Sequence, residues 1–205
     1  MPRRRGAAGR VALLHAIAHI ELNAIDLAWD MIARFASPDL PRAFYDDWVK
    51  VGDEEAKHFT LLSTRVAELE AAYGDLPAHD GLWQSAQETA HDVLARLAVA
   101  PLVLEARGLD VTPVMIEKLD KAGDIESARI LRIILAEEVG HVAAGWRWFG
   151  HIATARGLDP APAFQALVRR YYRGTVRPPF NRASREAAGF SAAWYEPLAE
   201  PESPA

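Results

Sequence analysis

The dominant pattern along the chain is helical, with apolar residues spaced three or four apart over long segments. The sequence offers no convincing run of alternating β-branched residues bounded by hairpin turns. The first segment, from Val11 to about Phe35, is apolar on much of its circumference, which is typical of a helix buried among others. It ends at Ser37-Pro38, where proline stops a helix.

Further helices are predicted from the same spacing and from the turn residues between them. Second and third long helices are expected over residues 39–73 and 82–107, each ending before a glycine. Thr112 offers a cap, with Pro113 at the first position of a short helix that ends near Gly123. The last predicted helices are a fourth long one from the Asp124 cap to about Arg156 and a shorter one over residues 160–173.

Four long helices indicate an all-α four-helix bundle. We expect a basic, flexible segment over residues 1–10, the bundle over 11–157, and a C-terminal helix and tail over 158–205 that pack on the bundle. The stretch 74–91 is a candidate crossover. The pattern leaves open whether the second and third helices run parallel.

Composition narrows the chemistry. The 205 residues suit one domain, with half of them apolar and a quarter charged. The net charge of −5 gives no reason to expect nucleic acid as a partner. Because cysteine is absent, disulfides, thiolate metal sites and cysteine nucleophiles are excluded, and a metal would have to be held by His, Asp and Glu.

The N-terminus, MPRRRGAAGR followed by VALLHAIAHI, resembles a secretory signal in its charged and apolar parts. His15, His19 and Glu21 interrupt the apolar run, and no stretch approaches the roughly 20 apolar residues that span a bilayer. We therefore expect a soluble, cytoplasmic protein that does not enter a membrane. His15 and His19 are interpreted as packing or surface residues.

Two Glu-x-x-His pairs are the candidate chemistry. Glu55 with His58, in EEAKHF, and Glu138 with His141, in EEVGHV, each place a carboxylate and an imidazole on one side of a helix. A third pair, Glu88 and His91, occurs in the polar run WQSAQETAHD. Such a pair alone is a weak signal, since an exposed helix face produces it by chance.

Two further glutamates, Glu21 and Glu105, lie in strongly apolar surroundings where an unpaired carboxylate is costly to bury. The midpoint between residues 21 and 55 is Pro38, and the midpoint between 105 and 138 falls beside Gly123. In antiparallel hairpins each pair would therefore meet at one height, provided that residues 113–122 prolong the third helix past Gly108. We prefer Glu105 to Glu88, which is expected to face solvent or a helix end.

These residues match the ligand pattern of ferritin-like carboxylate proteins, which take one Glu from each of two helices and Glu-x-x-His from the other two. Four buried carboxylates carry a charge of −4, which two divalent cations neutralise. Iron is the expected metal, with manganese or a mixed pair compatible and zinc a substitute. Glu55 and Glu138 are the expected bridges, Glu21 and Glu105 are terminal, and each ion takes one histidine, so the predicted ligands are Glu21, Glu55, His58, Glu105, Glu138 and His141.

Three neighbours of the site carry expectations of their own. Pro101, four residues before Glu105, should distort the third helix, either as a π-bulge or as a simple kink. Glu54 and Glu137 point about 100° away from the predicted ligands and are expected to support them or to face solvent.

Beyond the ligand pattern, most of the chain resembles a bacterial family of ferritin-like proteins classed as a domain of unknown function. The resemblance implies the ferritin-like fold and the same six ligands, without an assigned reaction. The segments that carry it are LLHAIAHIELNAIDLAWD, FYDDWVKVGDEEAKHFTLL, YGDLPAHDGLW, TAHDVLARLAVAPLVLEARGLDVTP and AEEVGHV.

The leading functional hypothesis is a dinuclear non-haem iron or manganese oxidoreductase that uses O2 or peroxide on a small substrate. An electron-donor protein is a compatible partner, since no cysteine-ligated module is present to supply electrons, and a homodimer is compatible too. The substrate is expected to enter beside the distorted part of the third helix. The alternatives are an iron-oxidising storage protein and a metal-stabilised bundle without turnover.

Overall fold

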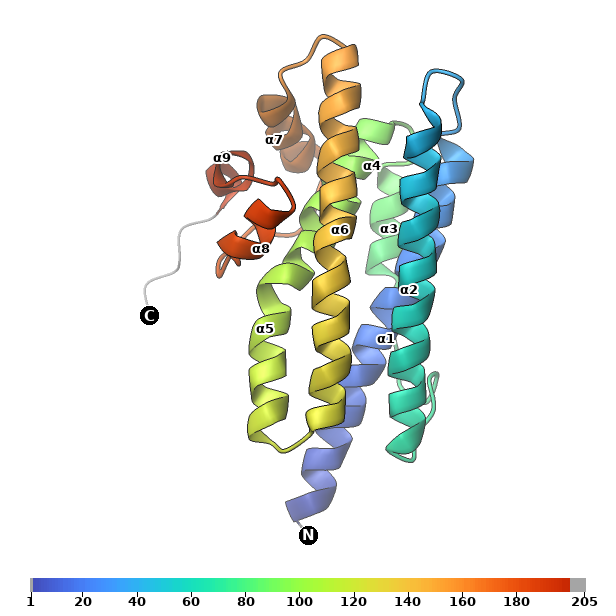
Figure 1. Ribbon diagram of the computed structural model, residues 1–205, viewed down its shortest axis with the longest axis vertical. Coiled ribbons are helices and arrows are strands. Elements are labelled where there is room, and N and C mark those ends of the chain that lie inside the picture. Colours follow the sequence, from blue (N-terminus) through green and yellow to red (C-terminus); the bar gives the residue numbers. More distant parts are fainter. Residues whose placement is uncertain (1, 200–205) are drawn as a thin grey trace.

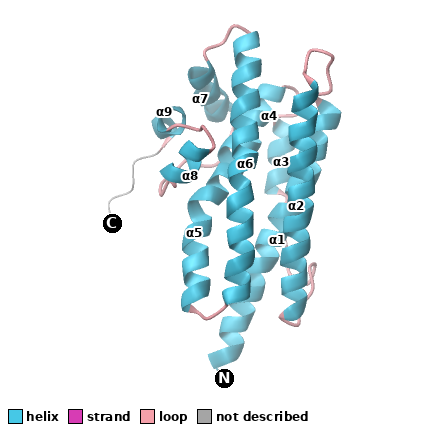
Figure 2. Cartoon of the chain, viewed as in Figure 1, coloured by secondary structure: helices cyan, strands magenta, loops and turns pink. Residues whose placement is uncertain are grey.

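The computed structural model describes residues 2–199, and in that range it contains helices and no strand (Figure 2). The prediction of an all-α protein is confirmed. Four long helical runs lie side by side along the longest axis of the molecule (Figure 1). They are α1 (Pro2–Arg34), α2 (Arg42–Glu68), α6 (Ile125–Ala155) and a composite run of α4 (Val93–Val99), a π-helix (Ala100–Glu105) and α5 (Ala106–Lys121).

The crossover predicted at residues 74–91 links α2 to the composite run. It returns the chain along the length of the bundle and contains α3 (Gly81–Glu88). As a result α2 and the composite run point the same way, while α1 and α6 point the opposite way (Figure 1). Two histidines of α1 form hydrogen bonds with the start of the crossover. His15 accepts from the Gly74 amide (2.9 Å), and His19 bonds to the hydroxyl of the preceding residue, Tyr73 (2.8 Å).

The predicted third helix over residues 82–107 begins within one residue of its expected start, at Gly81, but the prediction is wrong about its continuity and about its C-terminal end. The helix is interrupted between Glu88 and Val93, where Asp92 caps α4 by accepting from the Leu94 amide. Buried Arg96 holds this break together, because its guanidinium donates to the Ala86 carbonyl at 2.6 Å and to Thr89 at 2.9 Å. A side chain seven or more residues away thus satisfies the polar groups at the end of α3.

At the other end the helix does not stop at Gly108, and Pro113 lies inside α5 instead of starting a new helix. Proline removes the amide that would bond to the carbonyl four residues earlier, here Leu109. The Asn181 side chain donates to that carbonyl at 3.1 Å and so replaces the missing bond. Residues 113–121 therefore do prolong the helix, as the predicted ligand geometry required.

Other boundaries also differ from the prediction, and two differ by several residues. Helix α1 begins at Pro2 instead of Val11. Helix α2 ends at Glu68, short of Tyr73, because Glu70 takes a left-handed conformation with φ of 61°. Hydrogen bonds from the Glu70 and Ala71 amides to the carbonyls of Ala67 and Val66 complete the helix-ending motif usually closed by glycine.

The distortion expected at Pro101 is a π-helix over Ala100–Glu105. Its widened turn lies against α6 at Gly145, where an added Cβ would come within 2.6 Å of the Pro101 ring. Glycine at this position is thus what lets the two backbones approach. The π-helix ends on Glu105, one of the predicted ligands.

The C-terminal segment packs against α4, α5 and α6 (Figure 1). It comprises α7 (Pro160–Tyr171), α8 (Arg182–Ala187), α9 (Ala192–Tyr195) and a 3-10 turn (Glu196–Leu198). Phe164 and Phe190 join Phe149 of α6 in the core. A buried ion pair of Arg185 with Asp110 ties α8 to α5 through two hydrogen bonds of 2.9 and 2.7 Å.

Helix α1 is long and apolar enough, over Ala8–Arg34, to meet the length and composition of a membrane span, and it is the one such helix in the described chain. One face of this helix is buried within the bundle, where Leu14, Ala18, Leu27 and Met31 are at most 6% exposed, while Ile20 and Trp29 are exposed. The cytoplasmic location remains a prediction.

Candidate metal centre

The six predicted ligands come together midway along the four long helices, between two apolar clusters. One cluster contains Leu14, Leu62 and Ile134, and the other contains Met31, Trp48 and Phe149. All six residues lie within two groups whose ligand atoms fit inside 4.8 Å: Glu21, Glu55, His58 and Glu138 in one, and Glu105, Glu138 and His141 in the other. Glu138 belongs to both groups.

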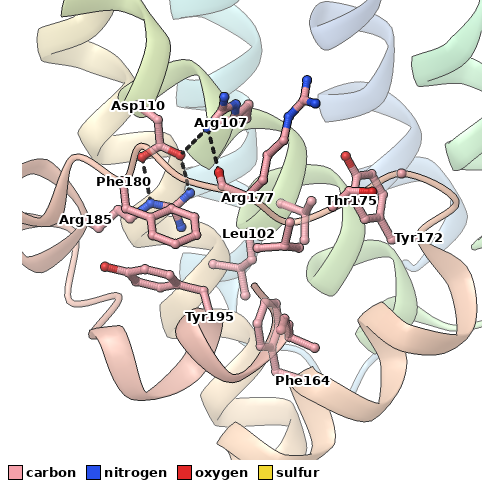
Figure 3. A pocket seen from close by; sticks show the side chains of 14 residues that line it. Leu102, Arg107, Asp110, Phe164, Tyr172, Thr175, Arg177, Phe180, Arg185 and Tyr195 are labelled. Atoms are coloured by element: carbon pink, nitrogen blue, oxygen red, sulfur yellow. Dashed lines mark hydrogen bonds and ion pairs between the residues drawn. The ribbon is translucent and has the colours of Figure 1, made fainter. Parts of the chain in front are cut away.

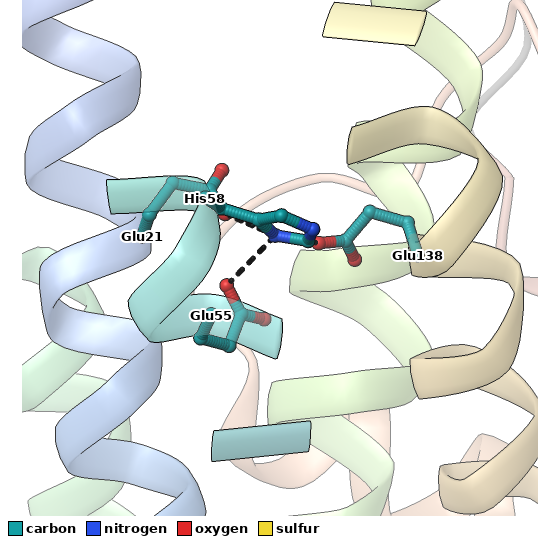
Figure 4. Close-up of side chains that lie close together, drawn as sticks. All are labelled: Glu21, Glu55, His58 and Glu138. Atoms are coloured by element: carbon teal, nitrogen blue, oxygen red, sulfur yellow. Dashed lines mark hydrogen bonds and ion pairs between the residues drawn. The ribbon is translucent and has the colours of Figure 1, made fainter. Parts of the chain in front are cut away.

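The first group is built around His58, whose Nδ1 faces the carboxylates (Figure 4). Nδ1 lies 3.0 Å from Glu21 Oε2, 3.5 Å from Glu55 Oε2 and 3.7 Å from Glu138 Oε1. The four side chains are contributed by α1, α2 and α6 and are all buried. A cation among these atoms would have one nitrogen and several oxygens within reach.

The second group repeats this arrangement around His141. Its Nδ1 lies 3.0 Å from Glu55 Oε1 and 3.4 Å from Glu138 Oε1, and Glu105 completes the group from the end of the π-helix. The two carboxylate oxygens of Glu55 therefore face different histidines. The imidazole rings lie 5.7 Å apart between centroids.

The outer nitrogens of the two histidines bind the first glutamate of the opposite Glu-Glu pair. His58 Nε2 donates to Glu137 at 2.8 Å, and His141 Nε2 donates to Glu54 at 3.0 Å. Because a carboxylate can only accept, Nε2 carries the proton and the Nδ1 lone pair can point into the site. The sequence predicted supporting or surface roles for Glu54 and Glu137, but it did not reveal that each serves the histidine of the other helix.

Within the described chain, several of the possible ligand atoms have no hydrogen-bond partner, and their spacing is that of atoms bound to one cation. Among the described residues, both oxygens of Glu55, Oε2 of Glu105, Oε2 of Glu138 and Nδ1 of His141 are buried without a hydrogen-bond partner. Orphaned polar atoms of this kind are costly. Two ligands bound at right angles to one ion at about 2.1 Å would lie about 3.0 Å apart, the separation of His141 Nδ1 and Glu55 Oε1.

The burial and close spacing of these carboxyl groups and imidazoles shift their pKa values. Burial raises the pKa of Glu21 and of Glu105 well above the ordinary value, and neighbouring carboxylates raise both further. Burial opposes the charged form of His58, but Glu21 and Glu55 outweigh it and raise the His58 pKa to about 10. Burial likewise raises the Glu55 pKa, yet the adjacent imidazoles lower it to about 2. Protons and metal ions therefore compete for these lone pairs.

A cavity of about 250 Å³, called here the apolar cavity, lies beside the cluster. Glu21, Glu55, Glu105 and Glu138 of the cluster are among the residues that line it. The rest is mainly apolar and includes Ile17, Leu27, Leu104, Met115 and Ile134. Part of its wall is the π-helix, which is where the sequence analysis placed substrate entry.

Other polar residues named from the sequence lie apart from the cluster. Glu88 forms an ion pair with Arg173 at 3.2 Å, and His91 contacts the Tyr171 hydroxyl. The third Glu-x-x-His pair therefore contacts residues at the surface and not the cluster. His19 also contacts the backbone carbonyl of His79 at 2.8 Å.

Comparison with known proteins places the chain in a family of unknown function, which is the coarser part of the resemblance found in the sequence. A family model described as "Protein of unknown function (DUF455)" matches residues 1–196. The chain belongs to the DUF455 family. A relative from Haemophilus influenzae, named only as an uncharacterized protein, is 45% identical over 188 residues, which is 89% of this chain and 65% of the relative. The DUF455 chain thus spans just under two thirds of that relative's length, and no solved structure matches it.

Proposed function

We propose that this DUF455 protein is a ferritin-like, dinuclear metal carboxylate oxidoreductase that uses O2 or peroxide on a small, largely apolar substrate. The observation that carries the proposal is the set of buried, unpartnered carboxylate and imidazole atoms that converge beside an apolar cavity. The parallel course of α2 and α5, with its long crossover, also agrees with a ferritin-like arrangement.

One ion would be held by Glu21 and His58, and the other by Glu105 and His141, with Glu55 and Glu138 shared between them. The ligand set is rich in hard oxygens with one imidazole for each ion, which favours iron. Manganese or a mixed pair suits the same set, and zinc would occupy it as a substitute. Bound iron or manganese would supply redox chemistry and open positions for O2 or peroxide.

The protein's own residues have three tasks in this proposal. Glu54 and Glu137 hold the imidazoles in the tautomer that offers Nδ1 to the metal. The two flanking apolar clusters exclude water from the ends of the site. The apolar cavity orients a substrate against the Glu21, Glu105 and Glu138 side of the cluster.

The first test is metal analysis of protein expressed with iron, together with melting temperature after addition of Fe(II), Mn(II) or Zn(II). We expect two ions per chain and a metal-dependent rise in melting temperature, since an ion that binds only the folded state stabilises it. Glu138→Gln should lower the metal content. Glu88→Gln, in the Glu-x-x-His pair that contacts Arg173, is the matched control and should keep both ions.

Fewer than one ion per chain, with no stabilisation by any of the three metals, would contradict the proposal. O2 consumption by the Fe(II)-loaded protein then tests turnover. Loading without any reaction with O2 or peroxide would leave a structural metal site. Light scattering separates a closed storage shell from a monomer or dimer.

A further inference from the structure

A second cavity, called here the basic cavity, adjoins the apolar one. It has a volume of about 320 Å³ and lies between α5 and the C-terminal segment (Figure 3). Arg107, Arg177 and Arg185 line it against a single acidic residue, Asp110, so its charged lining sums to +2. Arg107 and Tyr172 line both cavities and therefore form the wall between them.

Arg107 keeps part of its guanidinium free. Nη1 donates to the carbonyls of Arg177 (2.9 Å) and Pro179 (3.1 Å), which fixes the side chain. No hydrogen bond within residues 2–199 engages Nε or Nη2 of Arg107. This edge of a guanidinium matches a carboxylate or phosphate with two parallel hydrogen bonds.

The nearby acid neutralises Arg107 only in part. Asp110 forms an ion pair with Arg107 Nη1 at 3.6 Å, but the same carboxylate is engaged by Arg185 through two hydrogen bonds and by the Asn181 amide at 2.9 Å (Figure 3). Arg177 is exposed, and the structure shows no ion pair for it within the described chain. The positive charge at the wall is thus available to a ligand.

The apolar cavity, on the other side of this wall, is lined mainly by apolar residues. Apart from the four glutamates of the metal cluster, Arg107 is the one charged residue, among those described, that lines the apolar cavity. A ligand in that cavity would place an apolar part against Leu27, Leu104 and Ile134 and could place an anionic end only at Arg107.

We infer that the substrate of the metal site is a single-tailed anionic amphiphile, whose carboxylate or phosphate head binds Arg107 and whose tail fills the apolar cavity beside the metal ligands. This inference rests on the proposed function. It assigns Arg107 to head-group recognition and Arg177 to an added electrostatic contribution from the basic cavity.

The test measures binding to metal-loaded protein of known metal content by calorimetry. The probes share one chain length: decanoate, decyl phosphate, 1-decanol and decyltrimethylammonium. We expect one or both anions to bind about tenfold or more tightly than the alcohol, because the head makes charge-assisted hydrogen bonds. The stronger anion identifies the head. Across butyrate, hexanoate and octanoate, affinity should rise about fourfold per methylene.

Arg107→Met keeps the apolar stem and removes the charge, so it should abolish the preference for anions over 1-decanol. Arg177→Met should reduce that preference less. Because the Arg177 side chain is exposed, this variant also tests the inference if Arg107→Met does not fold. Arg129→Met, in an exposed pair with Glu126 away from both cavities, is the matched control and should behave as wild type.

Equal binding of decanoate, decyl phosphate and 1-decanol by wild type, or an anion preference that survives Arg107→Met, would overturn the inference and leave the metal site standing. Protein that takes up no metal would remove the proposed function and the inference together, and metal analysis decides that before any probe is added.

Discussion

Replacing Gly145 by alanine tests whether the close contact between α6 and the π-helix supports the metal centre. The new Cβ would lie 2.6 Å from Pro101 Cβ and 2.7 Å from its Cγ. Carbon atoms in contact normally lie about 3.5–4.0 Å apart, so the two elements would have to separate by about 1 Å. The proline ring offers no rotamer that relieves the clash.

The expected magnitude follows from two opposing contributions. Overpacking of a close-packed interior costs about 1–3 kcal/mol, while alanine in place of glycine inside a helix stabilises by roughly 0.5–1 kcal/mol. We expect Gly145→Ala to lower the free energy of unfolding by roughly 1–2 kcal/mol. Because the π-helix ends on Glu105, the displacement should also weaken metal binding.

Gly150→Ala is the matched control on the same helix, since nothing lies within 4 Å of its added Cβ. This change should stabilise by about 0.5–1 kcal/mol. The assay is urea unfolding of both variants without metal, followed by metal content after reconstitution. If Gly145→Ala is as stable as Gly150→Ala and binds two ions, the contact does not position the site.

Three further changes test other parts of the structure. Metal affinity should rise from pH 6 to pH 9, because the raised pKa values of Glu21 and Glu105 and the His58 pKa of about 10 mean that metal must displace protons; a pH-independent affinity in metal titrations would count against the cluster geometry. Asp124→Asn should cost roughly 1–2 kcal/mol at neutral pH, since burial of Asp124 is outweighed by hydrogen bonds from Ser127 and Arg65 that lower its pKa. That contribution is present above the unfolded pKa of about 3.9 and is lost as pH falls through the lower folded value, so wild type and variant should converge in acid unfolding and not at high pH. Glu70→Gly should raise the melting temperature through a gain of about 1 kcal/mol, because φ of 61° strains a non-glycine residue; an unchanged or lower melting temperature would show that the glutamate is not strained.

The sequence predicted the long helices and the meeting of Glu21 with Glu55 because both depend on local signals: spacing along a helix and breaks midway between the residues. The boundaries of the third helix depended instead on contacts with distant residues. Arg96 stabilises a break that propensity does not show, and Asn181 removes the break that Pro113 suggested. Neither partner could be assigned without the fold.

The candidate site likewise has parts that local sequence signals predicted and parts that depend on the fold. The Glu-x-x-His spacing predicted that these Glu and His side chains face inward, whereas the pairing of Glu54 with His141 and of Glu137 with His58 depends on how α2 and α6 face each other. The repeated Glu-Glu pairs were the signal for it, since two adjacent acids on a helix point in different directions. The basic cavity and the free edge of Arg107 gave no signal in the sequence, because they arise where the C-terminal segment meets α5.

The pairing of each histidine with a glutamate of the other helix affects how the two proposed metal positions would be occupied. Each histidine is held by the helix that carries the other histidine, and Lys57 of α2 joins the same network by contacting Glu137. In the proposed two-metal site, an ion that binds His58 would also fix α6 through Glu137, and with it His141. The first ion would thereby bear part of the ordering cost of the second, which is positive cooperativity. Half-loaded protein should be scarce in native mass spectra during metal titration, and Glu137→Gln should make it abundant.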